Sequence, residues 1–231
     1  MTPPPPIPLL FRDGSLVVAG KPSGLAVHRG MSREKTVVLQ LVRNLVGRHV
    51  YPVHRLDRAT SGALLLALDP ATARRLQEQW ESGAVDKRYL ALVRGIPPEA
   101  GVIDSPVPRS PGGARVPAVT GYRRLATFER YALVEARPLT GRLHQIRRHL
   151  KHISHPLIGD VRYGKGEHNR LFRERFGLHR LALHAWLLSF DHPVTGERLE
   201  IVAPLPEDLA APLRRMGIDA GAIGHATLSP P

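Results

Sequence analysis

The stretch that most limits how this chain can fold is the unbroken apolar run Ala63–Leu68. Ser61-Gly62 precedes the run, and Asp69-Pro70 follows it. No side chain within the run is suited to water, so a strand formed here must be covered on both of its faces. We therefore expect a fully buried strand.

A polar cluster stands directly before this strand, with two arginines, a carboxylate, two hydroxyls and a glycine. Asp57, between Arg55 and Arg58, is the residue that needs an explanation. It is either part of a surface ion pair, worth about 0–1 kcal/mol, or an acid held rigidly for chemistry. Residue spacing by itself leaves both interpretations open.

The remaining pattern predicts more strands than helices. Two strands joined by a turn at Asp13-Gly14 are expected over 9–18, and 97–116, rich in Pro and Gly, is expected to be mostly loop. Because few helices are available for crossovers, we expect an α+β fold in a single domain, with a mixed, largely antiparallel central sheet flanked by helices. Further strands are expected over 88–96, 118–127, 130–138 and 181–190, and a short last strand is expected to end at residue 203. Helices are expected over 35–45, 70–82 and 142–153, and beyond residue 204.

The expected domain covers residues 9–210. A disordered Pro-rich lead-in is expected over 1–8 and a C-terminal tail over 211–231. No segment approaches the ~20 apolar residues of a membrane span, and no basic segment followed by an apolar core suggests secretion. The chain has no cysteine, which excludes disulfides and thiolate metal sites and favours the cytoplasm.

The charge balance predicts a polyanionic partner. Lys and Arg number 33 against 20 Asp and Glu, which gives a formal charge of +13. Residues 142–180 alone carry ten basic and three acidic residues, a surplus of seven. RNA, DNA and anionic membrane all suit such a charge, and because no membrane span is expected, we expect a soluble nucleic acid that faces mainly this segment. His149, His152 and His155 recur every three residues, but they lack a nearby carboxylate set and do not favour a metal site.

A helical projection of 142–153 places Arg147 at the border of the buried face, whereas Arg148, Lys151 and His152 point toward water. The buried face itself is formed by Leu143, Ile146, Leu150 and Ile153. A guanidinium at a core edge needs a fixed anion, because it cannot be deprotonated and its unpaired burial costs several kcal/mol. Asp57 is the proposed partner, and Thr140 is expected to cap the helix.

Four ordered motifs resemble those of the RluA-type family of RNA pseudouridine synthases. His54-Arg55-Leu56-Asp57 with Thr60-Ser61-Gly62 resembles the active-site signature, and Lys21-Pro22-Ser23-Gly24 the first motif. Lys87-Arg88-Tyr89 resembles the tyrosine motif, and residues 140–147 the arginine motif. The resemblance extends from about residue 11 to about residue 203.

The resemblance implies roles for single residues. Asp57 would be the catalytic carboxylate and Arg147 its partner, while Arg55 would assist base flipping. Tyr89 would stack on the uracil and remove the proton from C5, although a tyrosine opening a strand is also typical of half-buried packing. Together with the basic surface of 142–180, the residues expected to bind RNA or substrate are His54, Thr60, Arg142, His144, Ile146, Arg148, Lys151, Lys165 and Arg170.

The implied reaction breaks the bond from N1 to C1′ of a uridine and rejoins the uracil through C5. This isomerisation is redox-neutral and requires no cofactor, and no dinucleotide or P-loop fingerprint is present. Asp57 could attack C1′, add to the uracil, or remove a C2′ proton to form a glycal. These three routes remain open.

Residues 163–170 and 176–180, together with Val27-His28-Arg29 and His54, resemble the branch typified by tRNA pseudouridine synthase C, which modifies a T-stem uridine of the position 65 class. The implied partner is tRNA, with 23S rRNA as the alternative. We expect a monomer with no membrane association and no obligatory protein partner. A non-catalytic RNA-binding module and a histidine-based nuclease are the rival interpretations.

Overall fold

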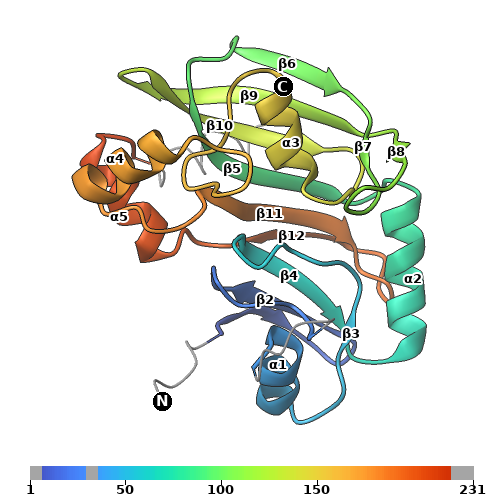
Figure 1. The fold of residues 1–231 in the computed structure, drawn as a ribbon. Helices are drawn as coiled ribbons and strands as arrows, with labels where there is room; N and C mark the ends of the chain where they lie inside the picture. Colours follow the sequence, from blue (N-terminus) through green and yellow to red (C-terminus); the bar gives the residue numbers. More distant parts are fainter. Residues whose placement is uncertain (1–6, 30–35, 220–231) are drawn as a thin grey trace. The chain divides into compact units, whose positions relative to one another are not determined.

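The structure, a computed structural model, describes residues 7–29 and 36–219 (Figure 1). Their contacts divide the chain into two compact units. The first runs to Arg88 and takes in Ala185–Pro204, whereas the second comprises Tyr89–His184 and resumes at Leu205. Two strands, β5 (Asp86–Arg94) and β11 (Leu183–Asp191), therefore each continue from one unit into the other along the chain.

The first unit is built on the predicted buried strand. In its sheet the strand order is β1-β2-β4-β11, with β3 paired to β4 and β12 paired to β11. All seven residues of β4 are buried, which confirms the interpretation of the apolar run. The other elements of this unit are β1 (Leu9–Arg12), β2 (Leu16–Lys21), β3 (Tyr51–Pro52), β12 (Arg198–Val202), α1 (Val38–Val46) and α2 (Pro70–Glu81).

The entry to β4 depends on Gly62. Its φ of +120° is one that side-chain-bearing residues rarely adopt, and a Cβ added there would lie 2.1 Å from the carbonyl oxygen of Ala185 in β11. After β4, the side chain of Asp69 accepts a hydrogen bond from the N–H of Thr72 at 2.8 Å, and Pro70 opens α2, as predicted. Leu65 and Phe190 are fully buried in the core that these elements enclose.

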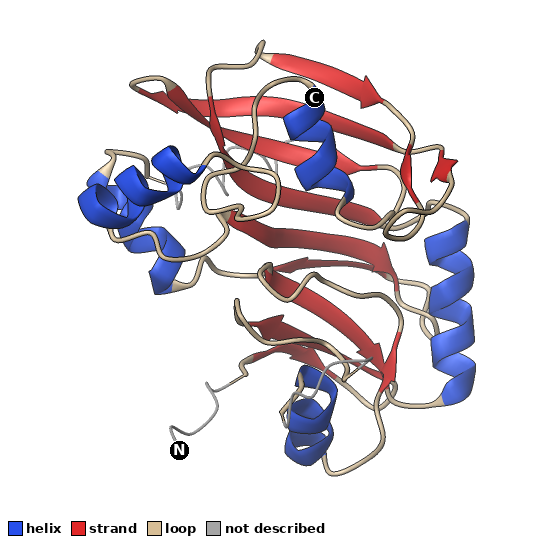
Figure 2. Ribbon diagram, in the orientation of Figure 1, coloured by secondary structure: helices blue, strands red, loops and turns tan. Residues whose placement is uncertain are grey.

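The second unit is also mainly β (Figure 2), with the strand order β5-β10-β9-β6. Helix α3 lies over β9 and β10, and α4 lies beside α5 (Figure 1). The strands are β6 (Ala100–Asp104), β9 (Val119–Phe128) and β10 (Tyr131–Pro138), with β7 (Val107–Pro108) and β8 (Arg115–Val116) forming a separate pair. The helices are α3 (Gln145–His152), α4 (Gly166–Phe176) and α5 (Glu207–Arg215).

The predicted α+β class with a largely antiparallel sheet flanked by helices is confirmed. Two local predictions were wrong, and one helix was missed. The expected loop over 97–116 contains β6, which pairs with β9 although only Ile103 of its side chains is buried. Helix α4 was not predicted, because its charged residues hide the buried stripe of Phe172 and Phe176. Helix α3 begins at Gln145 instead of residue 142, and Thr140 does not cap it.

The domain limits stay predictions. Residues 1–6 of the expected lead-in and 220–231 of the expected tail lie outside the described residues. Pro8 is described, and its carbonyl accepts a hydrogen bond from the N–H of Gly20 at 2.8 Å. Among the described residues no helix has the length and apolar character that crossing a bilayer requires.

Candidate active site

Asp57 lies in the connection between β3 and β4, in the first unit. The N–H of Thr60 donates to the carbonyl of Asp57 at 3.0 Å, so residues 57–60 form a tight turn. Thr60 is buried, Asp57 is half-buried and Arg55 is exposed. The turn therefore holds the carboxylate on a rigid support beside the buried strand.

The Lys-Pro-Ser-Gly segment braces this turn. The ammonium of Lys21, which is 1% exposed, donates to the carbonyl of Arg58 at 3.0 Å. The hydroxyl of Ser23 donates to the carbonyl of Ala59 at 2.7 Å, and the N–H of Gly24 to that of Arg58 at 2.8 Å. In return the guanidinium of Arg58 donates to the carbonyl of Gly24 at 2.9 Å. This segment is thus the support on which the Asp57 turn rests.

His54 ties the same connection to the sheet. Its Nε2 accepts a hydrogen bond from the N–H of Leu65 at 2.9 Å, and its ring stacks on Trp80 with centroids 4.3 Å apart. Burial, with the positive charge of Lys87, lowers the pKa of His54 to about 3. The imidazole is therefore neutral and its accepting nitrogen is occupied by the backbone. The predicted contact of His54 with RNA stays a prediction.

Tyr89 opens the second unit, in β5, where it lies opposite Ala136 of β10. The tyrosine is half-buried. This is the position expected from its place at the start of a strand, and it fits both interpretations of the residue, packing and stacking on a base.

Arg147, on α3, is buried as the helical projection predicts, with 8% exposure. Its Nε donates to Oδ2 of Asp160 at 2.8 Å and its Nη2 donates to Oδ1 at 2.9 Å. Sequence reasoning missed Asp160 as a partner, because a projection shows which side of a helix is buried but not which anion meets it. The pairing of Arg147 with Asp57 stays a prediction, since the two residues belong to different units.

Asp160 is itself tightly held. Its Oδ1 also accepts hydrogen bonds from the N–H groups of Arg162 and Tyr163, at 2.9 and 3.0 Å. Burial opposes ionisation of this carboxyl, but the hydrogen bonds from Arg147 and from these N–H groups outweigh burial and hold the pKa of Asp160 below its ordinary value. Asp160 is therefore a buried, charged carboxylate at neutral pH.

A second polar network fixes α3 on β9. The side chain of Gln145 donates to the hydroxyl of Thr120 at 2.9 Å, and that oxygen lies 2.9 Å from Nδ1 of His149. Nε2 of His149 lies 2.9 Å from the carbonyl of Ser105, which only accepts, so the imidazole proton is assigned to Nε2. Burial lowers the pKa of His149. Both of its ring nitrogens are used inside the protein, as a structural role requires.

Tyr163 contacts several residues of the predicted RNA-facing surface. Its hydroxyl lies 3.0 Å from Nδ1 of His144, a residue in the left-handed conformation at the start of α3. Tyr163 was not predicted as a site residue. The cations around its ring are Arg147 at 5.1 Å, Arg148 at 5.3 Å, Arg162 at 5.6 Å and Lys151 at 5.9 Å from the centroid.

The other residues of this unit that were predicted to bind RNA have different surroundings. Ile146 is 7% exposed and packs inward, whereas Arg142 is exposed, with its Nε 3.3 Å from the carbonyl of Pro117. Lys165 and Arg170 are exposed at and within α4. Their contacts with RNA stay predictions.

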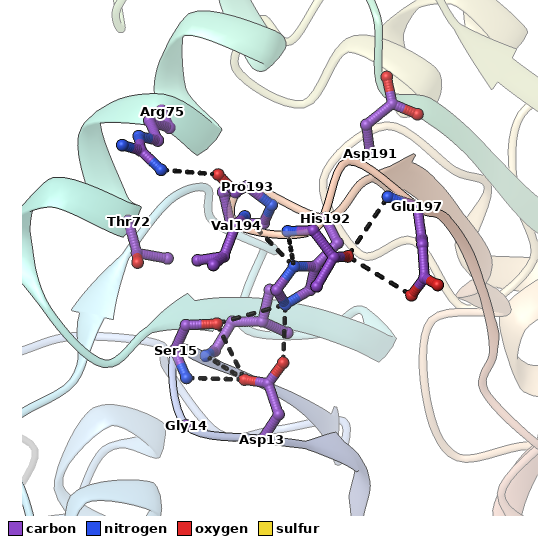
Figure 3. A network of polar contacts seen from close by, with 12 residues as sticks. Asp13, Gly14, Ser15, Thr72, Arg75, Asp191, His192, Pro193, Val194 and Glu197 are labelled. Carbon is purple, nitrogen blue, oxygen red and sulfur yellow. Dashed lines mark hydrogen bonds and ion pairs between the residues drawn. The ribbon is translucent and has the colours of Figure 1, made fainter.

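Asp13, Ser15 and His192 resemble a catalytic triad in composition only (Figure 3). Asp13 Oδ2 and Ser15 Oγ both approach Nε2 of His192, at 2.7 and 3.3 Å. The remaining nitrogen, Nδ1, accepts the N–H groups of Val194 and Thr195 at 3.2 and 3.0 Å. No ring nitrogen is left to act as a base toward the serine, so this network joins two turns of the first unit and activates no nucleophile.

Known proteins match this chain over most of its length. A family model described as RNA pseudouridylate synthase matches residues 15–152, more than half of the chain. The tRNA pseudouridine synthase C of Pectobacterium carotovorum subsp. carotovorum is 45% identical, over 84% of this chain and 58% of that protein. The tRNA pseudouridine synthase C of Haemophilus ducreyi is 42% identical, over 86% of this chain and 91% of that protein.

Solved structures agree with the sequence matches. Human RNA Pseudouridylate Synthase Domain Containing 4 superposes with a TM-score of 0.75 at 32% identity, over 91% of this chain and 93% of the human one. Human RNA Pseudouridylate Synthase Domain Containing 1 gives a TM-score of 0.78 at 25% identity, over 100% and 99%. The chain therefore belongs to the RluA-type family of RNA pseudouridine synthases, isomerases that convert uridine to pseudouridine.

Proposed function

We propose that this pseudouridine synthase acts on tRNA, at a T-stem uridine of the position 65 class. The relatives that are 42–45% identical are tRNA pseudouridine synthases C. The formal charge of +13 supports a long polyanionic substrate, because each neutralised phosphate releases counterions and adds to affinity. The alternative substrate is 23S rRNA.

The observation that carries the proposal is the support around Asp57. A solvated surface ion pair needs no fixed backbone, yet the 57–60 turn is held by hydrogen bonds from Lys21, Ser23 and Gly24 at 2.7 to 3.0 Å. Burying an ammonium almost completely so that it holds a loop carbonyl costs desolvation free energy, and an aspartate in a surface ion pair does not require such a support. The arrangement supports a carboxylate whose place must be accurate, as catalysis requires.

In the proposed reaction the target uridine leaves its stack, which costs a few kcal/mol. Arg55, exposed beside the turn, occupies the vacated space, and Tyr89 stacks on the extruded uracil. Asp57 carries the exchange of the bond from N1 to C1′ for the bond from C5 to C1′. Tyr89 takes the proton released from C5 as its own phenolic proton passes to solvent, and the freed N1 takes up a proton from solvent, so the isomerisation gains and loses no proton overall. Arg147 supplies the positive charge that accompanies the carboxylate through this exchange.

The test uses purified protein and tRNA that carries tritium at uridine C5. The proposal predicts tritium release at an unchanged RNA chain length, loss of release in Asp57→Ala, and wild-type release in the control Asp191→Asn, whose side chain makes only an exposed ion pair. Mapping the product should find one pseudouridine in the T-stem. Release from 23S rRNA but not from tRNA would contradict the substrate, and shortening of the RNA would favour a nuclease.

A non-catalytic RNA-binding module makes the opposite prediction. Both interpretations expect the affinity for tRNA to persist in Asp57→Ala. The binding module alone predicts that wild-type protein releases no tritium from any unmodified RNA. Measuring release and affinity on the same preparation therefore separates the two interpretations.

A further inference from the structure

We propose that Asp160 is a positioning residue of the synthase, which orients the guanidinium of Arg147 for the isomerisation. This inference rests on the proposed function, in which Arg147 accompanies the reacting carboxylate. Asp160 itself touches neither uracil nor ribose in this account, and it acts only through the arginine.

The contact between the two side chains fixes an orientation as well as a distance. Nε and Nη2 of Arg147 meet the two oxygens of Asp160 at 2.8 and 2.9 Å, so the guanidinium and carboxylate planes are joined by two parallel hydrogen bonds. The side chains are 9% and 0% exposed. A single hydrogen bond would leave the guanidinium free to rotate, whereas this pair does not.

The carboxylate is fixed from behind by the loop that carries it. The N–H groups of Arg162 and Tyr163 both donate to Oδ1 of Asp160. Asn169, which is 9% exposed on α4, accepts the N–H of Gly159 at 2.8 Å and donates to the carbonyl of Asp160 at 3.0 Å. The orientation of Arg147 is therefore set through two layers of contacts, from α4 to the loop and from the loop to α3.

Stability alone does not account for this arrangement. Removing two charges from water is costly, and buried ion pairs are often replaced by apolar residues at no loss of stability. The pair with Asp160 engages Nε and Nη2 of Arg147. Because the guanidinium is planar and rigid, this bidentate contact also fixes the direction in which its remaining donors point.

The first test is Asp160→Asn, compared with wild type in single-turnover tritium release at saturating enzyme and in tRNA affinity. The amide keeps one oxygen, so the bidentate contact is lost while the size of the side chain is kept. We expect the rate to fall about 10- to 100-fold, the effect of a displacement of about 1 Å in a catalytic group. The Kd for tRNA should stay within about twofold, because Asp160 donates nothing to phosphate.

Two further variants guard against a simple folding defect. Asn169→Ala removes the clamp on the loop but keeps both charges, and a smaller fall in rate is expected. Asp208→Asn removes another aspartate paired with a buried arginine of the same unit, Arg180, at 2.8 Å. This control should lower Tm and leave the single-turnover rate within about twofold of wild type.

A double variant tests whether Asp160 acts through Arg147. If it does, Arg147→Met with Asp160→Asn should be no slower than Arg147→Met alone, since the two changes remove one device. The inference would be overturned if the rate losses of Arg147→Met and Asp160→Asn multiplied in the double variant, or if Asp160→Asn were as fast as wild type. It would also be overturned if the control Asp208→Asn lost as much rate as Asp160→Asn and the two variants had equal losses in Tm. Inactive wild-type protein would instead refute the proposed function.

Discussion

His54 provides a stringent test of the support around the candidate active site. The imidazole accepts the N–H of Leu65 and stacks on Trp80, and its pKa is lowered to about 3 from an ordinary value of 6.5. In the unfolded chain the histidine takes up a proton near pH 6.5, whereas in the folded protein it resists protonation down to about pH 3. The unfolded state therefore binds more protons throughout this window, and acid must destabilise the fold.

The size of the effect follows from the shift. Each pH unit between the two pKa values removes about 1.4 kcal/mol from the free energy of unfolding. Between pH 7 and pH 4.5, His54 alone should therefore cost about 2.5 kcal/mol, and about 5 kcal/mol once the pH falls below 3. At neutral pH its contribution is fully retained, because the imidazole is uncharged in both states.

The assay compares urea unfolding of wild type and His54→Gln at pH 7, 5.5 and 4.5. Glutamine keeps an oxygen that can accept the N–H of Leu65 but has no proton to gain in this range. We expect the wild type to lose about 2.5 kcal/mol more than the variant over this range. His149 and His168, whose pKa values are also lowered, are present in both proteins and cancel in the difference. Equal acid sensitivity would refute the neutral state of His54.

Two further perturbations test the packing beneath the site. Gly62→Ala places a Cβ 2.1 Å from a carbonyl oxygen of β11 at a φ of +120°, so we expect a loss of more than about 4 kcal/mol or failure to fold in a urea titration, whereas Gly14→Ala, with nothing within 4 Å, should change stability by less than about 0.5 kcal/mol. Equal stability of the two variants would contradict the close approach of the strands. Thr120→Val leaves Nδ1 of His149 without its partner at constant side-chain volume, so unfolding should require about 1–3 kcal/mol less free energy; an unchanged midpoint would contradict the network.

Residues whose environment is set by their neighbours in the sequence were predictable. The run 63–68 has one solution, a strand covered on both faces, and β4 is that strand. Asp69 and Pro70 mark the start of α2, because the side chain of Asp69 accepts a hydrogen bond from a free N–H of the first turn and Pro70 has no N–H that needs a partner. The border position of Arg147 follows from helical geometry, and the arginine is buried.

What remained hidden depends on residues distant in the sequence. Nothing in the residues around Lys21 indicates that a lysine would be 1% exposed, because one of the two carbonyls that accept from it, that of Arg58, lies 37 positions away. Asp160 lies 13 residues beyond Arg147, and only the tertiary fold brings their charges together. Strand β6 escaped prediction since an edge strand that buries one side chain has almost no apolar pattern.

The central claim is that one carboxylate, Asp57, held on the braced turn, carries the isomerisation. The most direct measurement is the single-turnover rate of tritium release from C5-labelled tRNA for wild type and Asp57→Asn, each with its tRNA affinity. Asparagine keeps the shape of the side chain and removes its charge. We predict undetectable release by the variant with a Kd within about twofold of wild type. Release by Asp57→Asn at a rate near that of wild type would contradict the claim.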